Sequence, residues 1–241
     1  FLVSIPQAAE TDFSSLKFVL YGASPIADDT ILKAKEIMKC DLFQVYGLTE
    51  TAGAITILMP EDHDPEKGKL RSCGKALNSV EIKVVDDEGN EVKTGDIGEV
   101  ISKSPLNMKG YWNRPDATEE AIKDGWFYSG DAGFFDDEGY LYIHDRVKDM
   151  IVSGGENIYP AEVENALMSH PEIADAAVIG VPDDKWGESV KGFVVLQPDS
   201  SLDETEIISY TRTQIAGYKC PKTINFIEAL PRNPSGKILR R

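Results

Sequence analysis

Residues 145–160 read DRVKDMIVSGGENIYP, and this stretch decides how the rest of the chain is interpreted. It begins as a charged turn, continues as a short apolar segment around Ile151, and reaches the pair Gly154–Gly155 before Pro160. Glycines without a Cβ let a backbone turn tightly or approach a narrow ligand. Proline is favoured in the first turn of a helix. The stretch therefore predicts a strand, a loop that approaches a ligand, and the start of a helix.

The sequence before residue 146 predicts an α/β layer followed by a small β structure. Hydrophobic patterns indicate an apolar strand at 17–21, a helix at 28–39 and a second strand at 42–46. This order suggests that a ligand binds at the carboxyl ends of the strands. Between residues 70 and 145, alternating apolar residues predict a small β-barrel or a curled sheet.

Two matching turns and a compact second domain complete the expected fold. Residues 86–89 and 136–139 both read DDEG, which is typical of hairpin turns. Beyond residue 146 the pattern is again α/β, and Gly217 is expected to end its second helix. The elements predicted there are helices at 161–169 and 203–216 and strands at 150–152, 176–181, 191–196 and 223–227. The expected class is mixed α/β, with the end of a large α/β plus β-barrel domain in residues 1–145 and a small α/β domain in residues 146–241.

Composition narrows the classes of function. The net charge of −16 argues against binding to nucleic acid or to an anionic membrane. A nucleotide site remains compatible, because it needs only a few local donors and a metal ion. No apolar run approaches the ~20 residues of a transmembrane helix. Cys40, Cys73 and Cys220 are isolated, so we expect no disulfide framework or zinc site and predict a cytoplasmic location.

The hexapeptide Tyr46-Gly47-Leu48-Thr49-Glu50-Thr51 follows a predicted strand. A hydroxyl beside a carboxylate at a strand end suits contact with a phosphate and a magnesium ion. Thr49 would donate to the phosphate and Glu50 would hold the cation. For these residues alone the favoured interpretation is a Thr-Glu helix cap, because such caps are common.

Three further segments carry chemistry that suits a nucleotide. Gly22-Ala23-Ser24-Pro25 offers small residues for flat contact with a purine, although an ordinary Ser-Pro turn has the same sequence. Asp131, in Ser-Gly-Asp, is able to accept hydrogen bonds from both ribose hydroxyls. Pro234-Ser235-Gly236-Lys237 forms a stiff loop with one lysine, whose point charge suits an α-phosphate. A basic terminal tail is the alternative for Lys237.

These motifs together resemble the adenylate-forming enzymes, the superfamily of acyl-CoA synthetases, luciferases and peptide-synthetase adenylation domains. They occur in family order over nearly the whole chain. The resemblance favours the phosphate and magnesium role of Thr49 and Glu50 over the helix cap. It also implies that Arg146 holds the ribose of ATP with Ile143 nearby, that Lys148 is a domain hinge, and that Gly154 and Gly155 border the CoA tunnel.

Within that superfamily the chain looks most like an AMP-forming carboxylate–CoA ligase of the fatty-acyl or aryl type. The implied substrates are a small carboxylate, ATP with Mg²⁺, and CoA, and AMP is released. Two steps are implied, formation of an acyl-adenylate and transfer of the acyl group to CoA. The small domain would act as a lid that rotates about Lys148 between the steps and withdraws Lys237.

One departure from the family pattern sets an expectation about extent. The family's phosphate loop, rich in Ser, Thr and Gly, has no counterpart in this sequence. The sequence therefore predicts a truncated and catalytically incomplete portion of an enzyme. Two alternatives remain open, an adenylation domain that loads a carrier-protein thiol and a non-catalytic nucleotide-binding module. No nucleophile or metal motif includes Ser189, His63, His144 or His170. We therefore expect the three histidines to be structural or on the surface.

Overall fold

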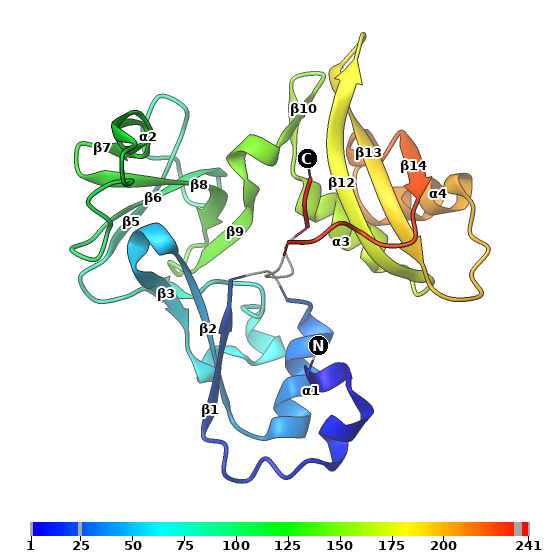
Figure 1. The fold of residues 1–241 in the computed structure, drawn as a ribbon, viewed down its shortest axis with the longest axis horizontal. Coiled ribbons are helices and arrows are strands. Elements are labelled where there is room, and N and C mark those ends of the chain that lie inside the picture. The colour runs from blue at the N-terminus through cyan, green and yellow to red at the C-terminus, as the bar shows by residue number, and fades with distance from the viewer. Residues whose placement is uncertain (1, 24–25, 234–237, 241) are drawn as a thin grey trace. The chain divides into compact units, whose positions relative to one another are not determined.

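The computed structural model describes residues 2–23, 26–233 and 238–240. The chain divides into two compact units, Phe1–Ile143 and His144–Arg241. Each unit combines sheets with a few helices (Figure 1), which confirms the predicted mixed α/β class. None of the helices in this described part of the chain has both the length and the apolar character that a membrane crossing requires.

The first unit begins with a parallel strand–helix–strand arrangement. Its elements are β1 (Phe18–Gly22), α1 (Asp28–Met38), β2 (Asp41–Leu48), the 3-10 turn η3 (Thr49–Thr51), β3 (Gly53–Leu58) and β4 (Lys75–Ala76). β1 and β2 are parallel, whereas β3 and β4 continue the sheet antiparallel in the order β1-β2-β3-β4. α1 buries Ile31 in a cluster with Leu42 and Leu70. The carboxyl ends of β1 and β2 therefore lie at one edge of the sheet, where Gly22 pairs with Val45.

A five-stranded sheet follows in the first unit, and its last strand, β9, ends in residues 144–146 of the second unit. Its elements are β5 (Glu81–Val85), β6 (Gly98–Lys103), α2 (Pro115–Ala121), β7 (Ile122–Lys123), β8 (Trp126–Phe135) and β9 (Leu141–Arg146). The order is β5-β6-β8-β7, with β9 also paired to β8, and the ladders of β5, β6, β7 and β8 are antiparallel. Val84, Val100 and Leu141 form its buried core with Cys73. The choice between the two predicted forms, a small β-barrel and a curled sheet, stays a prediction.

The two DDEG segments form the predicted turns. In each, the glycine N–H donates to the carbonyl of the first aspartate, from Gly89 to Asp86 at 3.0 Å and from Gly139 to Asp136 at 2.9 Å. The glycines have φ of 84° and 79°, a left-handed conformation that favours glycine. The same four-residue sequence therefore forms the same kind of turn between two different pairs of strands.

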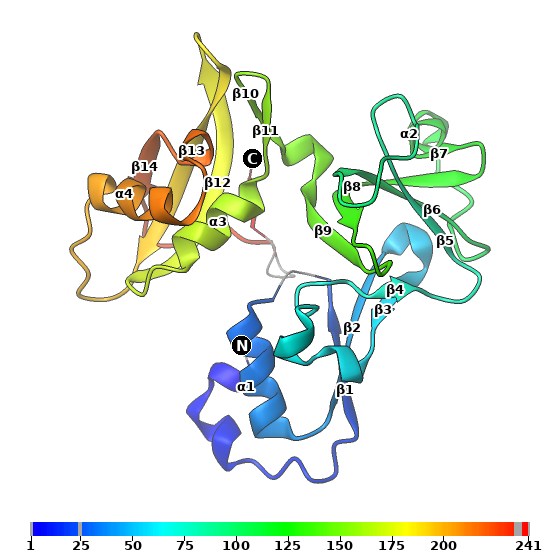
Figure 2. The same ribbon diagram turned by 180° about the vertical axis from the view of Figure 1, so that it is seen from behind.

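The second unit packs two helices on one face of a second five-stranded sheet (Figure 2). Its elements are the 3-10 turn η6 (Val147–Asp149), β10 (Ile151–Ser153), β11 (Glu156–Ile158), α3 (Pro160–Met168), β12 (Ile173–Asp183), β13 (Gly187–Leu196), α4 (Glu204–Gln214), the 3-10 turn η7 (Gly217–Lys219) and β14 (Thr223–Phe226). The order is β11-β10-β13-β12, with β14 parallel to β13. Val163 and Leu167 of α3 and Ile207 of α4 are fully buried in its core.

The end of α4 differs from the sequence prediction. The helix stops at Gln214, and Ile215 is extended at φ −135° and ψ 165°. Gly217 opens η7 instead of capping the helix. Ile215 packs against the core of the unit, so the burial of an apolar side chain takes the chain out of the helix before glycine is reached.

Candidate active site

Predicted nucleotide-binding residues lie at the edge of the first sheet where β1 and β2 end. A Cβ added to Gly22 would lie 2.1 Å from the carbonyl oxygen of Val45, so this position requires glycine. Ala23 follows with a left-handed φ of 65°. Ser24, the remaining predicted adenine contact, lies outside the described residues. Gly47 is equally constrained, because an added Cβ would lie 1.9 Å from the oxygen of Gly53.

The turn after β2 is closed by Thr51, and the phosphate role of Thr49 stays a prediction. The Thr51 hydroxyl accepts from the Leu48 N–H at 2.9 Å and donates to the Gly53 carbonyl at 2.7 Å. Thr51 is fully buried, whereas Thr49 is exposed and Glu50 is half-buried. Since Thr51 closes the turn, the hydroxyl of Thr49 and the carboxylate of Glu50 remain presented at the strand end.

Glu50 fits one way of binding magnesium. Among the described residues no group of three or more His, Cys, Asp or Glu side chains could form a metal site. In the same part of the chain no Lys or Arg forms an ion pair with Glu50. Mg²⁺ is commonly bound by one or two carboxylates together with substrate phosphates. A single carboxylate without a cationic partner among the described residues suits that mode better than a site made of protein ligands alone.

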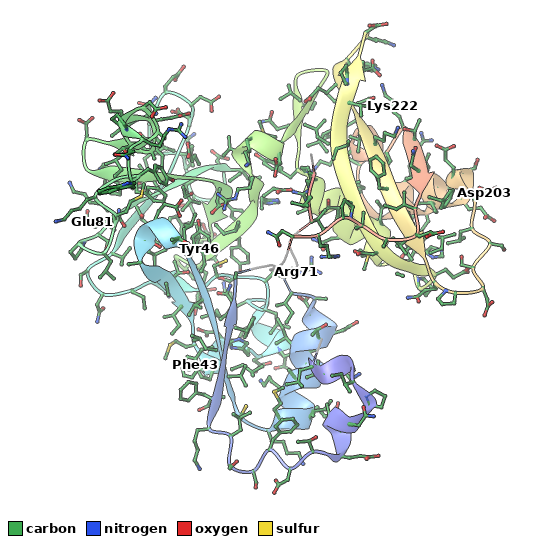
Figure 3. The ribbon with its side chains drawn as sticks, in the orientation of Figure 1. Phe43, Tyr46, Arg71, Glu81, Asp203 and Lys222 are labelled. Carbon is green, nitrogen blue, oxygen red and sulfur yellow. The ribbon has the colours of Figure 1, made fainter. Side chains whose placement is uncertain are left out.

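Asp131 and Tyr46 are in direct contact. The Tyr46 hydroxyl donates to Asp131 Oδ2 at 2.6 Å, from a position 85 residues earlier, and Figure 3 marks Tyr46 on β2. Burial, followed by the charge of Asp131, raises the pKa of Tyr46 far above its usual value, so the phenol stays protonated and donates. Asp131 itself is only 6% exposed. The structure thus brings together two residues that the sequence predicted separately.

A bulge in β8 presents Asp131. Glu99 pairs with Ala132 and Ile101 with Tyr128, so residues 129–131 stand opposite Val100 alone. Within the bulge, the Ser129 hydroxyl donates to the Val100 carbonyl at 2.6 Å and accepts from the Asp131 N–H at 3.0 Å. Gly130 has φ 69°, and such irregularities often redirect a side chain next to a functional site.

Ile143 and Arg146 lie on either side of the division between the units. Ile143 is half-buried and packs with Tyr46 against the core of the second sheet. Arg146 ends β9 in the second unit, and the exposed Lys148 is the middle residue of η6. The shared ribose site of Asp131 and Arg146 stays a prediction, because the two residues belong to different units.

The glycine pair forms the tip of a hairpin between β10 and β11. Gly154 and Gly155 have φ of 62° and 85°, as a two-residue turn of this kind requires. The Gly154 N–H donates to the Trp186 carbonyl at 2.8 Å. A Cβ on Gly154 would lie 2.7 Å from Cε3 of the Trp186 ring. Trp186 was not predicted from the sequence, although its place before Gly187 and Glu188 in a turn between two apolar strands was a usable signal.

The predicted catalytic residue Lys237 belongs to residues 234–237, which lie outside the described residues. The residues on both sides of this gap form hydrogen bonds or ion pairs within the second unit. Before the gap, Arg232 donates to Asp175 Oδ2 at 2.6 Å. After the gap, Leu239 N–H donates to the Pro231 carbonyl at 2.8 Å. Arg240 forms ion pairs with Asp145, Asp149 and Glu164.

The histidines have structural surroundings. His63 is fully buried, with Nε2 bonded to the Tyr21 hydroxyl at 2.9 Å and Nδ1 to the Met59 carbonyl at 2.9 Å. Burial lowers the pKa of His63 and of His144, whose ring lies 5.1 Å from that of Tyr159. His170 accepts from the Glu172 N–H at 3.2 Å. The expected structural or surface role of the three histidines stays a prediction.

Two family models match this chain, one in each unit. The AMP-binding enzyme model matches residues 2–112, and the AMP-binding enzyme C-terminal domain model matches residues 162–237. The chain belongs to this family of adenylate-forming enzymes. The predicted family membership is therefore confirmed.

Curated relatives of the family align along the whole chain. The fatty acid–[acyl-carrier-protein] ligase of Streptomyces coeruleorubidus and a long-chain-fatty-acid–CoA ligase of Mycobacterium tuberculosis are each 42% identical over 240 residues. Each alignment covers 100% of this chain and 46% of the relative. The chain thus spans about half the length of the curated relatives it matches.

Solved structures show the same fold. The o-succinylbenzoate CoA synthetase of Bacillus subtilis, in complex with its acyl-adenylate intermediate, has a TM-score of 0.89 at 40% identity, covering 99% of this chain and 48% of that chain. The same enzyme in complex with ATP and a magnesium ion has a TM-score of 0.84 at 40% identity, covering 93% of this chain and 45% of that chain.

Proposed function

We propose that the protein carrying this chain is an AMP-forming carboxylate–CoA ligase that acts on a fatty or aryl acid. A carboxylate oxygen attacks the α-phosphorus of ATP and expels pyrophosphate, which leaves an acyl-adenylate. The sulfur of CoA, after losing its proton, then attacks the acyl carbon and expels AMP. The observation that carries this proposal is the 2.6 Å hydrogen bond between Tyr46 and Asp131 at the strand end that also presents Glu50.

The first unit supplies the nucleotide site in this proposal. Thr49 donates to a phosphate oxygen, and Glu50 binds Mg²⁺, which when present neutralises phosphate charge. Asp131 accepts from the ribose hydroxyls while Tyr46 fixes its orientation. The remaining predicted contacts to the nucleotide are Gly22, Ala23, Ser24, Gly47 and Ile143.

The second unit supplies the groups that change between the two steps. Arg146 holds the ribose, and Lys237 neutralises the α-phosphate during adenylation. Gly154 and Gly155 border the CoA path during transfer. The small domain, residues 146–241, acts as a lid on the part of the large domain in residues 1–145 and turns about Lys148. Isolated cysteines favour the cytoplasm as its location.

A carrier-protein thiol is the second candidate acceptor. The observation in its favour is the name of one relative, a fatty acid–[acyl-carrier-protein] ligase at 42% identity. Adenylation would be unchanged, because only the attacking thiol differs. CoA is the preferred acceptor in this proposal, because the Mycobacterium tuberculosis relative is named a CoA ligase and the Bacillus subtilis enzyme a CoA synthetase.

Pyrophosphate exchange tests this function in the whole protein that contains the chain. We expect label to move from pyrophosphate into ATP only when a suitable fatty or aryl acid is present. Addition of CoA should then give the thioester and AMP, whereas a carrier protein should not. If a cooperatively folded preparation gives no acid-dependent exchange, the proposal is wrong. Exchange followed by transfer only to the carrier protein would replace CoA as the acceptor.

A further inference from the structure

Glu50 is held by a segment far from it in the sequence. The Tyr111 hydroxyl donates to Glu50 Oε1 at 2.8 Å across 61 residues. The Met108 N–H donates to the main-chain carbonyl of Glu50 at 2.6 Å. The segment between β6 and α2 therefore fixes both the backbone and the side chain of this glutamate.

Tyr111 is in turn anchored on α2. Its N–H donates to Thr118 Oγ1 at 2.9 Å, and the Thr118 hydroxyl donates to the Arg114 carbonyl at 2.8 Å. Gly110 precedes it with φ 152°, and an added Cβ there would lie 2.7 Å from Thr118 Cγ2. Thr118 thus holds the backbone of Tyr111, while the phenol of Tyr111 contacts Glu50.

The chemistry of the contact suits orientation rather than neutralisation. A phenol is a neutral donor, so it occupies one lobe of Oε1 without cancelling the negative charge of Glu50. Among the described residues no side chain donates to Oε2 of Glu50, whereas Tyr111 donates to Oε1. An arginine or lysine in the same place would compete with a cation for the carboxylate, whereas Tyr111 leaves Oε2 available.

The same tyrosine lies next to the other half of the nucleotide site. Tyr111, Ser129 and Gly130 line one pocket of about 700 Å³ in the first unit. Ser129 and Gly130 form the bulge that presents Asp131. The lining of one pocket thus includes both the tyrosine that contacts Glu50 and two residues of the bulge that presents Asp131.

We infer that Tyr111 is a positioning residue for the magnesium carboxylate Glu50. The inference rests on the proposed function, because it assigns Tyr111 a role toward the ion that Glu50 would bind. Removing an outer partner of a metal ligand typically costs about 10–100-fold in metal affinity or activity. We expect Tyr111→Phe to weaken metal binding by roughly 10-fold, toward the lower end of that range.

Direct metal titration tests this role in the whole protein. Mn²⁺, which is visible by electron paramagnetic resonance, replaces Mg²⁺ in the presence of saturating ATP. Wild type, Tyr111→Phe and Glu50→Gln are compared with Tyr142→Phe, which removes another tyrosine–carboxylate bond of the same unit, to Asp136 at 3.3 Å. We expect weaker Mn²⁺ binding in the first two variants and wild-type binding in the third.

A double variant separates positioning from a general loss of structure. With Glu50→Gln already present, Tyr111→Phe should weaken Mn²⁺ binding no further, because its partner is gone. Equal Mn²⁺ affinity of Tyr111→Phe and wild type overturns the inference while leaving the proposed function intact. An equal further loss in the Glu50→Gln background also overturns it, since Tyr111 would then act on the fold. Wild-type protein that binds no Mn²⁺ with ATP overturns the proposed function itself.

Discussion

Arg240 donates from Nη2 to both carboxylate oxygens of Glu164 at 2.8 Å. Its Nη1 reaches Asp145 Oδ1 at 3.3 Å and Asp149 Oδ2 at 3.4 Å. Glu164 also accepts from the Val178 N–H at 2.8 Å. One cation of the C-terminal segment therefore connects α3 with both ends of the turn that contains the proposed hinge.

Replacing Arg240 should destabilise the second unit. Arg240→Met leaves three acidic side chains together, of which Asp145 is 7% and Glu164 14% exposed. Breaking a buried ion pair from one side costs about 3–5 kcal/mol, and we expect about 3 kcal/mol here because Arg240 is 21% exposed. Hydrogen exchange in urea, read on peptides from β12 and β13, measures the change within this unit.

Arg232→Met is the matched control for that measurement. Its pair with Asp175 is as short, at 2.6 Å, but the side chains are 42% and 29% exposed. Exposed pairs contribute about 0–1 kcal/mol, so this variant should lose much less. Similar losses of unfolding free energy for Arg232→Met and Arg240→Met would show that the burial of the Arg240 cluster adds nothing to the stability of the second unit.

The cost of losing Arg240 should depend on pH. Burial raises the pKa of Glu164 above the usual glutamate value, and the charge of Arg240 opposes that rise. A carboxyl with a raised native pKa binds more protons in the folded state, so its contribution to stability falls as pH rises through that pKa. Arg240→Met removes the opposing charge and should enlarge this fall. Its deficit should therefore be smaller at about pH 5 than at about pH 8. A deficit that is constant over this range would exclude protonation of Glu164 as the cause.

Elements whose cause is local could be predicted from the sequence. Asp86 and Asp136 each form their turn through their own main-chain carbonyl and the glycine three residues later, so the DDEG sequence was sufficient. The start of α3 at Pro160 was predicted for the same reason. Gly217 was misjudged because Ile215 leaves α4 to reach the core, and that depends on the position of the whole sheet.

The difference between local and long-range causes also explains which residues of the candidate site could be predicted from the sequence. Glu50 and Asp131 stand in short motifs and were named from them. Tyr111 and Trp186 were missed, because their contacts with Glu50 and Gly154 join residues 61 and 32 positions apart. Such contacts depend on how segments distant in the sequence pack together, and a short motif does not contain that information.

The bond between Tyr46 and Asp131 should contribute to stability as well as to nucleotide binding. Tyr46→Phe leaves a buried carboxylate with one donor fewer, which costs about 1–3 kcal/mol. Tyr21→Phe is the control, since Tyr21 on the neighbouring strand bonds the neutral His63 at 2.9 Å and charge-assisted bonds are the stronger kind. We expect the larger loss in urea unfolding for Tyr46→Phe, together with a raised KM for ATP in pyrophosphate exchange. Equal losses in both variants would contradict a special role for the charged partner.

Gly154 and Gly155 offer a matched pair of substitutions. Both have positive φ, so alanine at either position costs about 1–2 kcal/mol of backbone strain. At Gly154 the new Cβ also meets the Trp186 ring at 2.7 Å, whereas nothing lies within 4 Å at Gly155. Gly154→Ala should therefore lower the melting temperature more and should move Trp186, which near-ultraviolet circular dichroism detects. If Gly155→Ala is the more damaging variant, the contact with Trp186 is not what constrains this turn.

Lys148 is the residue on which the proposed movement of the lid depends. It is exposed at the middle of η6, where a φ near −60° suits proline. Lys148→Pro should therefore be compatible with the conformation described here while preventing the change in φ that a hinge requires. We expect acyl-adenylate formation to persist and transfer to CoA to be lost, measured as pyrophosphate exchange and thioester formation in the whole protein.

Lys148→Ala separates the backbone from the charge in this experiment. Alanine removes the ammonium group but leaves φ free, so both half-reactions should continue at nearly the wild-type rate. Proline also restricts the preceding residue, Val147, which lies in the same turn, so each variant needs a melting curve beside its kinetics. A parallel fall of both half-reactions and of the melting temperature in Lys148→Pro would indicate local unfolding. Unimpaired thioester formation in Lys148→Pro would show that the lid does not turn at this residue. Proline fixes φ, so a movement that requires φ of residue 148 to change could not take place in this variant.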